Sequence, residues 1–193
     1  MAEPLAIDEN ALSLEFSAQL KGPRLPTFGA LGLLISNYAK VETVLQMYAR
    51  KTLGIDDSSA RIVFSGLRVS DVTSRLNALL LTNSANPRER AEFGLLSEQL
   101  QKITKARHLL VHNGISFVGH ESILVHKKFV SKRRDSFEKQ EFLLNELISM
   151  ADDCAYICVR ILKLLEPEFA SVPSLSEAGK SFVAEAFSPW RYA

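Results

Sequence analysis

The chain has few of the residues that define several protein classes. Only two of its 193 residues are cysteines, and Cys154 and Cys158 stand four apart, on one face of an expected helix. That spacing suits packing in a core better than a disulfide, so we expect a reducing, cytoplasmic environment. No run approaches the roughly 20 apolar residues of a membrane span, and residues 1–15 lack the basic start and apolar run of a signal peptide. The sequence therefore predicts a soluble protein without a membrane partner.

An excess of charge of one sign is also missing. The 23 lysines and arginines are balanced by 22 aspartates and glutamates, which leaves a formal net charge of +1. Strong non-specific nucleic-acid binders carry a basic coat, so any contact with nucleic acid must be local. Hydrophobic residues make up 47% of the chain, enough to bury the core of one domain over residues 1–193.

Four segments carry apolar residues at the three- and four-residue spacing of a buried helix face. We expect helices near 27–53, 66–82, 86–113 and 135–165. Stripes of this kind with short connections predict an all-α fold, an antiparallel four-helix bundle. Its core should lie at about 27–167, after an N-terminal extension at 1–26. The tail at 168–193 should hold one more short helix, around 176–187.

The expected helix ends follow from capping signals. Thr27 is the expected N-cap of the first helix, and Gly54 ends it. The third helix has the clearest start. Asn86 is the expected cap, Pro87 takes the first helical position and Glu89 closes a capping box.

One interruption separates the third expected helix from the fourth. Alternating apolar residues on the two sides of Gly119 indicate a small β-hairpin, formed around Ile115, Phe117, Ile123 and Val125. The fourth helix should then begin after a cap at Asp135 or Ser136 and stop before Pro167.

The third expected helix ends in the most informative residues of the chain, Arg107-His108-Leu109-Leu110-Val111-His112. Its apolar stripe steps through Phe93, Leu96, Leu100 and Ile103, and the next position in that register is Arg107. A guanidinium keeps its charge in proteins and is costly to bury without a partner. Arg107 therefore needs an anionic partner or an opening to water, which makes it a candidate site residue.

This motif resembles that of the HEPN superfamily, helical domains found in many prokaryotic ribonucleases, toxins and defence proteins. In that family the later helix of an all-α bundle ends in Arg, a polar residue, three mostly apolar residues and His, and His108 stands in the polar slot here. The resemblance covers roughly residues 27–167 in helix order. It implies a homodimer that brings two motifs into one cleft and cuts RNA without a metal ion or other cofactor. For a toxin it would imply an antitoxin or nucleotidyltransferase partner.

The side chains of the motif suit RNA cleavage by the neighbouring 2′-hydroxyl. Arg107 and His112 lie about 140° apart around a helix, so both can flank one groove without touching. Histidine can take or give a proton near neutral pH, and the fork of an arginine matches phosphate oxygens. We expect Arg107 and His112 to contact the scissile phosphate, with His108 as a supporting group.

Three other interpretations of these residues are open. Arg107 could form an internal ion pair, for instance with Glu42. A zinc site could use the four histidines, His108, His112, His120 and His126, although no cysteine or carboxylate cluster accompanies them. A third interpretation is a non-catalytic module for dimerisation or for nucleotide or anion binding, which would use Arg107 for the anion.

One strongly basic segment follows the hairpin. It contributes Lys127, Lys128, Lys132, Arg133 and Arg134. These residues either bind the RNA backbone or form a solvated loop. In the tail, Trp190 and Tyr192 either stack on bases or anchor the C-terminal segment.

Overall fold

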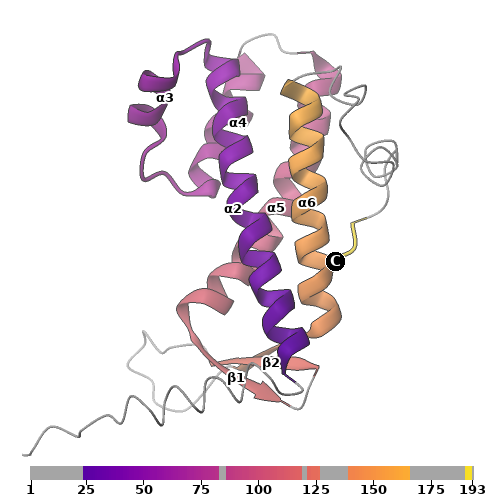
Figure 1. Cartoon of the computed structure of the whole chain (residues 1–193). Coiled ribbons are helices and arrows are strands. Elements are labelled where there is room, and N and C mark those ends of the chain that lie inside the picture. Colours follow the sequence, from indigo (N-terminus) through magenta and orange to yellow (C-terminus); the bar gives the residue numbers. More distant parts are fainter. Residues whose placement is uncertain (1–23, 83–85, 119–120, 127–138, 166–189, 193) are drawn as a thin grey trace, which may run out of the picture.

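The computed structural model describes residues 24–82, 86–118, 121–126, 139–165 and 190–192. This part of the chain is mostly helical, with one small antiparallel sheet (Figure 1). Its elements are α2 (Leu25–Leu53), α3 (Asp57–Phe64), α4 (Val69–Thr82), α5 (Pro87–His112), β1 (Gly114–Val118), β2 (Ser122–His126), β3 (Lys139–Leu143) and α6 (Leu144–Leu165). The expected N-terminal extension and the short helix around 176–187 lie outside the described residues.

Helix α2 begins two residues before the expected cap. Arg24 is the N-cap and makes no capping hydrogen bond with its side chain, while Pro26 lies in the first turn, where a missing N–H costs no helical bond. Thr27 is buried inside the helix, so its assignment as the cap was wrong. Gly54 ends the helix as predicted, in the left-handed conformation with φ 64°.

The expected helix over 66–82 is shorter in the structure, and a separate helix precedes it. Asp56 caps α3, and its carboxylate accepts hydrogen bonds from the backbone N–H groups of Ser58 and Ser59. Gly66 takes φ 73° in the turn before α4, which keeps the chain out of a helix there. The sequence stripe missed α3 because only Phe64 of its eight residues is buried.

The start of α5 is as predicted, except for the capping box. Asn86 accepts a hydrogen bond from the N–H of Arg88, and Pro87 holds the first helical position. The carboxylate of Glu89 instead accepts a 2.6 Å hydrogen bond from the Tyr48 hydroxyl on α2. A contact with another helix therefore replaces the capping interaction that was expected of this side chain.

The expected hairpin is present, and a third strand extends it. Strands β1 and β2 pair antiparallel with Ile115 opposite Val125 and Phe117 opposite Ile123. Residues 139–143, expected within the fourth helix, form β3 on the other edge of β2. Their alternation buries Phe142 opposite Ile123, and this long-range pairing outweighs the helical pattern. Helix α6 begins after it, and the expected caps Asp135 and Ser136 lie outside the described residues.

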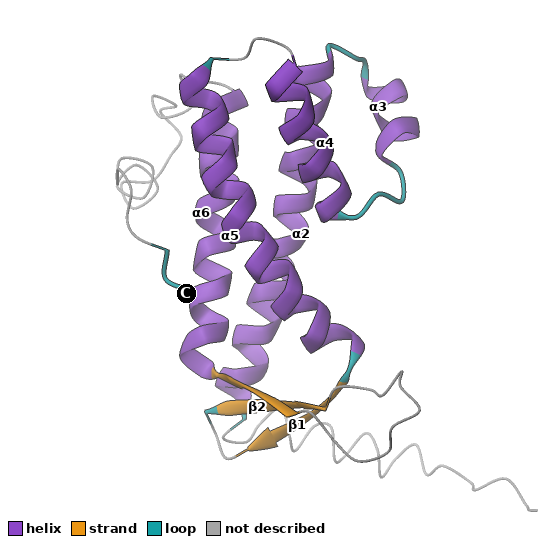
Figure 2. Cartoon of the chain, turned by 180° about the vertical axis from the view of Figure 1, so that it is seen from behind, coloured by secondary structure: helices purple, strands orange, loops and turns teal. Residues whose placement is uncertain are grey.

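The core lies between the helices and against the sheet. Most residues of the predicted stripes are buried: Leu34, Tyr38, Val41, Leu45 and Tyr48 on α2, Phe93, Leu96, Leu100 and Ile103 on α5, and Leu147, Ala151, Cys154, Cys158, Ile161 and Leu165 on α6. Leu31 and Leu144, which were expected on the same stripes, are only partly buried. Both cysteines are free and buried, as predicted. Figure 2 shows the sheet at the end of the molecule where α5 ends and α6 begins.

The helix directions differ from a fully antiparallel bundle. The amide of Asn37 donates to the carbonyl of Ala151, and Lys51 donates to the carbonyl of Leu165, so α2 and α6 run parallel. Helix α5 runs opposite to both, and α4 runs opposite to α5. The connection through α3 carries the chain back before α4 starts, so α4 points the same way as α2. No helix in the described part of the chain is long and apolar enough to cross a bilayer.

Candidate functional site

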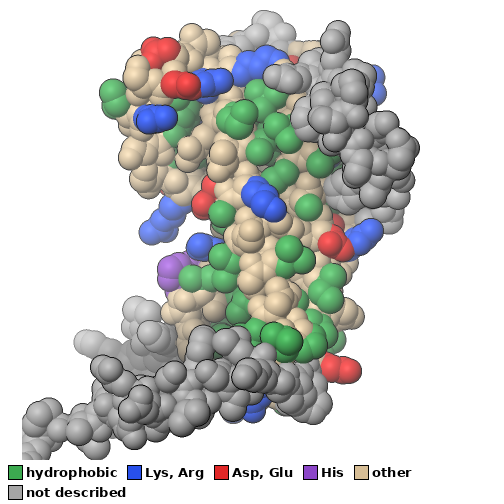
Figure 3. All heavy atoms as spheres, viewed as in Figure 1, with side chains coloured by type: hydrophobic (Ala, Val, Ile, Leu, Met, Phe, Trp, Pro, Cys, Tyr) green, Lys and Arg blue, Asp and Glu red, His purple; other side chains and the backbone are tan. Residues whose placement is uncertain are grey.

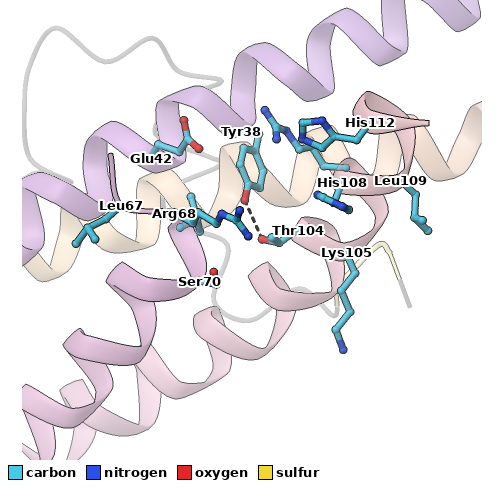
Figure 4. A pocket seen from close by; sticks show the side chains of 12 residues that line it. Tyr38, Glu42, Leu67, Arg68, Ser70, Thr104, Lys105, His108, Leu109 and His112 are labelled. Atoms are coloured by element: carbon cyan, nitrogen blue, oxygen red, sulfur yellow. Dashed lines mark hydrogen bonds between the residues drawn. The ribbon is translucent and has the colours of Figure 1, made fainter. Parts of the chain in front are cut away.

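A pocket of about 990 Å³ opens where the C-terminal half of α5 meets α2 and the start of α4. We call it the cationic pocket. Its walls are formed by Tyr38, Glu42, Leu67, Arg68, Val69, Ser70, Thr104, Lys105, Arg107, His108, Leu109 and His112 (Figure 4). The structure therefore brings all three predicted catalytic residues into one pocket of a single chain.

The charge of this pocket is predominantly positive. Arg68, Lys105 and Arg107 line it together with two histidines, and Glu42 is the only carboxylate among the lining residues. In the space-filling view, basic and histidine side chains gather at the notch below α3 (Figure 3). Such a wall attracts an anion, and its three permanent cations outnumber its one carboxylate.

Arg107 lies at the edge of the core and not on its buried stripe. The buried register of α5 continues from Ile103 through Ala106 to Leu110, which are all nearly inaccessible. Arg107 is one position further around the helix and is half-buried. The expected place on the stripe was therefore wrong by one residue, but the expected opening to water is present as the pocket.

The aromatic ring of Tyr38 on α2 lies against the guanidinium of Arg107, and we call this ring the Tyr38 platform. The guanidinium carbon of Arg107 lies 5.2 Å from the centre of the Tyr38 ring, within the range of a cation–π interaction. The Tyr38 hydroxyl lies 2.9 Å from Oγ1 of Thr104, which itself donates to the carbonyl of Leu100. Since a hydroxyl has one hydrogen, Tyr38 is the donor to Thr104. Burial raises the pKa of Tyr38, which keeps this donor protonated.

Arg107 has hydrogen-bonding capacity to spare. Its Nε atom is buried without a hydrogen-bond partner among the described residues. Glu42 lines the same pocket, but the ion pair considered from the sequence does not form within the described part of the structure. A buried unpaired donor is costly, so an anion that accepts a hydrogen bond from this Nε would offset that cost.

The two histidines of the motif lie side by side at the end of α5. The ring centroids of His108 and His112 are 4.6 Å apart, and both side chains are exposed. Neither ring takes part in a hydrogen bond within the described ranges. Both rings are exposed on the described surface, and no other described side chain orients either of them.

The other candidate ligands of a zinc site are not gathered here. His126 lies on β2, where its Nε2 is 2.8 Å from the Ser116 hydroxyl, and it does not line the pocket. His120 is outside the described residues. In the part that the structure describes, no three His, Cys, Asp or Glu side chains form a group suited to a metal ion.

Two other predictions concern the basic segment that follows β2 and the aromatic residues near the C-terminus. The basic residues Lys127, Lys128, Lys132, Arg133 and Arg134 lie outside the described residues, so their place relative to the pocket stays a prediction. Trp190 and Tyr192 pack against the core, as expected for an anchor. The interpretation of these aromatics as base-stacking residues is not supported by that position.

Sequence reasoning missed part of the pocket. Arg68 precedes α4 and is directed toward the Tyr38–Thr104 pair in Figure 4, although nothing in its local sequence marks it. Tyr38 was recognised only as a core residue. Its role could have been suspected from the place of an aromatic hydroxyl on a buried stripe, which needs a polar partner. No protein-family model, curated protein or solved structure matches the chain.

Proposed function

We propose that this protein is an endoribonuclease that cleaves RNA in the cationic pocket, and that its helical core is of the HEPN type. One observation carries the proposal: Arg107, His108 and His112 line a single open pocket whose other cations are Arg68 and Lys105. A phosphodiester is an anion with oxygens that match these donors. The same pocket offers imidazoles that can move a proton.

The proposed chemistry uses the substrate's own 2′-hydroxyl as nucleophile. His112 takes the proton from that hydroxyl, or gives one to the leaving 5′-oxygen. Arg107 donates to the phosphate oxygens as negative charge builds on them, and Tyr38 keeps its guanidinium in place. His108 supports His112, and the centroids of their two rings are 4.6 Å apart. Because these side chains supply the proton transfer and the charge stabilisation, the proposed reaction needs no metal ion.

We further propose that the active form is a homodimer. Val111 stands between His108 and His112 in sequence and is 41% exposed near the end of α5, where a second copy could cover it. A two-fold axis near this end would place two cationic pockets along one RNA strand. A role as a toxin or defence effector, with an antitoxin or nucleotidyltransferase partner, rests on the resemblance of the motif alone.

A second candidate is a non-catalytic module that binds a nucleotide or another anion. It is favoured by the two histidine rings, which have no hydrogen-bond partner to orient them within the described residues. General bases in enzymes are commonly held by a third group. Arg107 and its Tyr38 platform would serve anion binding equally well.

One experiment separates the two candidates. Purified protein is incubated with a mixed-sequence RNA in the presence of a chelator, and the products are sized and their ends identified. The endoribonuclease should produce fragments with 2′,3′-cyclic phosphate ends. RNA that is bound but left intact would support the module, and RNA that is neither bound nor cut would contradict the endoribonuclease.

A further inference from the structure

The described C-terminal residues occupy a second site, between α5 and α6. Trp190–Tyr192 lie beside α6 (Figure 1), and the residues that hold them share no member with the cationic pocket. The centre of this site is Asp153 on α6, whose side chain is only 3% exposed. A carboxylate that is this deeply placed needs hydrogen-bond donors around it.

Two side chains bind the backbone of this segment. Asp153 accepts hydrogen bonds from the N–H of Arg191 at 3.1 Å and from the N–H of Tyr192 at 3.0 Å. Gln99 on α5 donates to the Asp153 carboxylate at 2.8 Å and to the carbonyl of Tyr192 at 2.6 Å. Three backbone groups of the segment are thus satisfied by side chains of the helices.

The site also contacts the side chains of the segment. The Trp190 ring meets the Tyr156 ring edge to face, with centroids 5.7 Å apart. Arg191 forms an ion pair with Asp152. Tyr192 packs against the core, and burial raises its pKa. The site therefore suits an extended segment of aromatic, basic and aromatic residues.

The site is incomplete without such a segment. Among the described residues, the Asp153 carboxylate accepts two hydrogen bonds from the segment and one from Gln99. The segment does not satisfy the site fully, because Oε1 of Gln99 is buried without a donor among the described residues. Asp153 and Gln99 therefore direct their hydrogen-bonding groups at the backbone of the bound segment.

The covalent link does not dictate which copy of the chain fills the site. Residues 166–189 connect α6 to Trp190 and can reach up to about 80 Å when extended. From Leu165 back to Asp153 along α6 is only about 18 Å. A link so much longer than the span it must cover can reach its own site or that of a neighbouring molecule.

We propose that Gln99, Asp152, Asp153 and Tyr156 form a peptide-recognition site for an aromatic–basic–aromatic segment, and that Trp190–Tyr192 fills it as an exchangeable ligand. The partner that the site fits is the same segment of a second copy of this chain. This proposal does not rest on RNA cleavage, because its residues lie outside the cationic pocket.

The test uses a full-length chain with its own segment weakened. In the Trp190→Ala/Tyr192→Ala variant no tryptophan is left, since Trp190 is the only one. A synthetic peptide with the sequence of residues 188–193 is then the only tryptophan source, and its emission and anisotropy report binding. A second peptide carries N-methyl groups on the amides that correspond to Arg191 and Tyr192, which removes the two donors to Asp153.

The unmodified peptide should bind saturably, and the N-methylated peptide should bind at least about tenfold more weakly, because two hydrogen bonds to a carboxylate are lost. Asp152→Asn, added to the variant, should weaken binding and its salt dependence through the lost ion pair. Equal binding of the two peptides, or binding of neither, would overturn the proposal. The comparison of the two peptides is made on one folded protein, so it does not depend on whether a variant of Asp153 folds.

Discussion

Arg107 shows how a charged side chain is kept at the edge of a core. The ring of Tyr38 covers one face of its guanidinium, and the side chain lines the open pocket, although its Nε is buried without a partner among the described residues. Access to the pocket lowers the cost of placing this charge at the edge of the core. It also leaves the side chain free to bind phosphate, which an internal ion pair would not allow.

Substitution of the motif should separate chemistry from folding. His112→Ala and Arg107→Ala should each lower RNA cleavage by on the order of 10²-fold or more, because one removes the proposed proton carrier and the other the proposed phosphate ligand. His108→Ala should lower it less. Cleavage rates are compared with circular dichroism spectra of each variant. His126→Ala is the matched control, since His126 lies on β2 away from the pocket and should leave cleavage unchanged.

The Tyr38 platform can be tested with two variants. Tyr38→Phe keeps the ring and loses the hydrogen bond to Thr104, whereas Tyr38→Leu loses the ring. Because a cation–π contact contributes about 0.5–2 kcal/mol, kcat/KM should fall roughly 2- to 30-fold in Tyr38→Leu and much less in Tyr38→Phe. Equal losses in the two variants would show that the ring does not position Arg107.

The buried thiols should respond to pH in a defined direction. Burial raises the pKa of Cys158 to about 11 and also raises that of Cys154. The thiols of the unfolded chain have a pKa of about 8.5. The stability that comes from burying these thiols in neutral form is therefore complete below that pH and is lost as the pH rises toward 11. The free energy of unfolding should therefore fall less over this range in Cys154→Ala/Cys158→Ala than in the wild type. An identical fall in both proteins would contradict this assignment.

At the scale of elements, α5 takes part in the core, in the cationic pocket and in the site of the C-terminal segment. Its buried stripe packs in the core, its C-terminal half lines the pocket and Gln99 holds the C-terminal segment. Near its start, Glu92 pairs with Arg160 of α6, and both side chains are mostly buried, 15% and 11% exposed. The orientation of the Arg107–His112 motif therefore depends on contacts along the whole helix.

Removal of Glu92 should destabilise the fold. Glu92→Ala leaves Arg160 without this carboxylate in a poorly hydrated place, so the free energy of unfolding should fall by about 3 kcal/mol. Urea unfolding at constant pH measures the change. Asp57→Ala is the matched control, because its pair with Arg50 is exposed on both sides and should contribute less than about 1 kcal/mol. A Glu92→Ala loss as small as that of the control would argue against a structural role for the buried pair.

At the scale of the whole molecule, the proposed dimer is the main open expectation. Sedimentation at micromolar concentration should give twice the mass of one chain, and Val111→Lys should shift the protein toward the monomer by placing a charge at the proposed contact. The shift should be accompanied by loss of cleavage with the helical content unchanged. A fully active monomer would eliminate the dimeric active site.

The sequence by itself determined the elements that depend on local signals. Apolar spacing predicted the buried faces of α2, α5 and α6, and alternation predicted the β1–β2 hairpin. Gly54 and Asn86 mark helix ends through their own backbone and side-chain chemistry. These features require only neighbours a few residues away, which is why one sequence was enough to find them.

Tertiary structure alone decided the features that join distant parts of the chain. Residues 139–143 were expected within a helix but form strand β3, because they pair with β2. The Glu89 carboxylate accepts a hydrogen bond from Tyr48 instead of completing the expected capping box. The packing of α2, α4 and α5 sets the position of Arg107 at the edge of the core and its contact with the Tyr38 ring. The same packing brings Arg68 into the pocket. Periodicity places a residue on a helix face only to within about one position, since neighbouring positions lie about 100° apart, and packing decides which of them is buried.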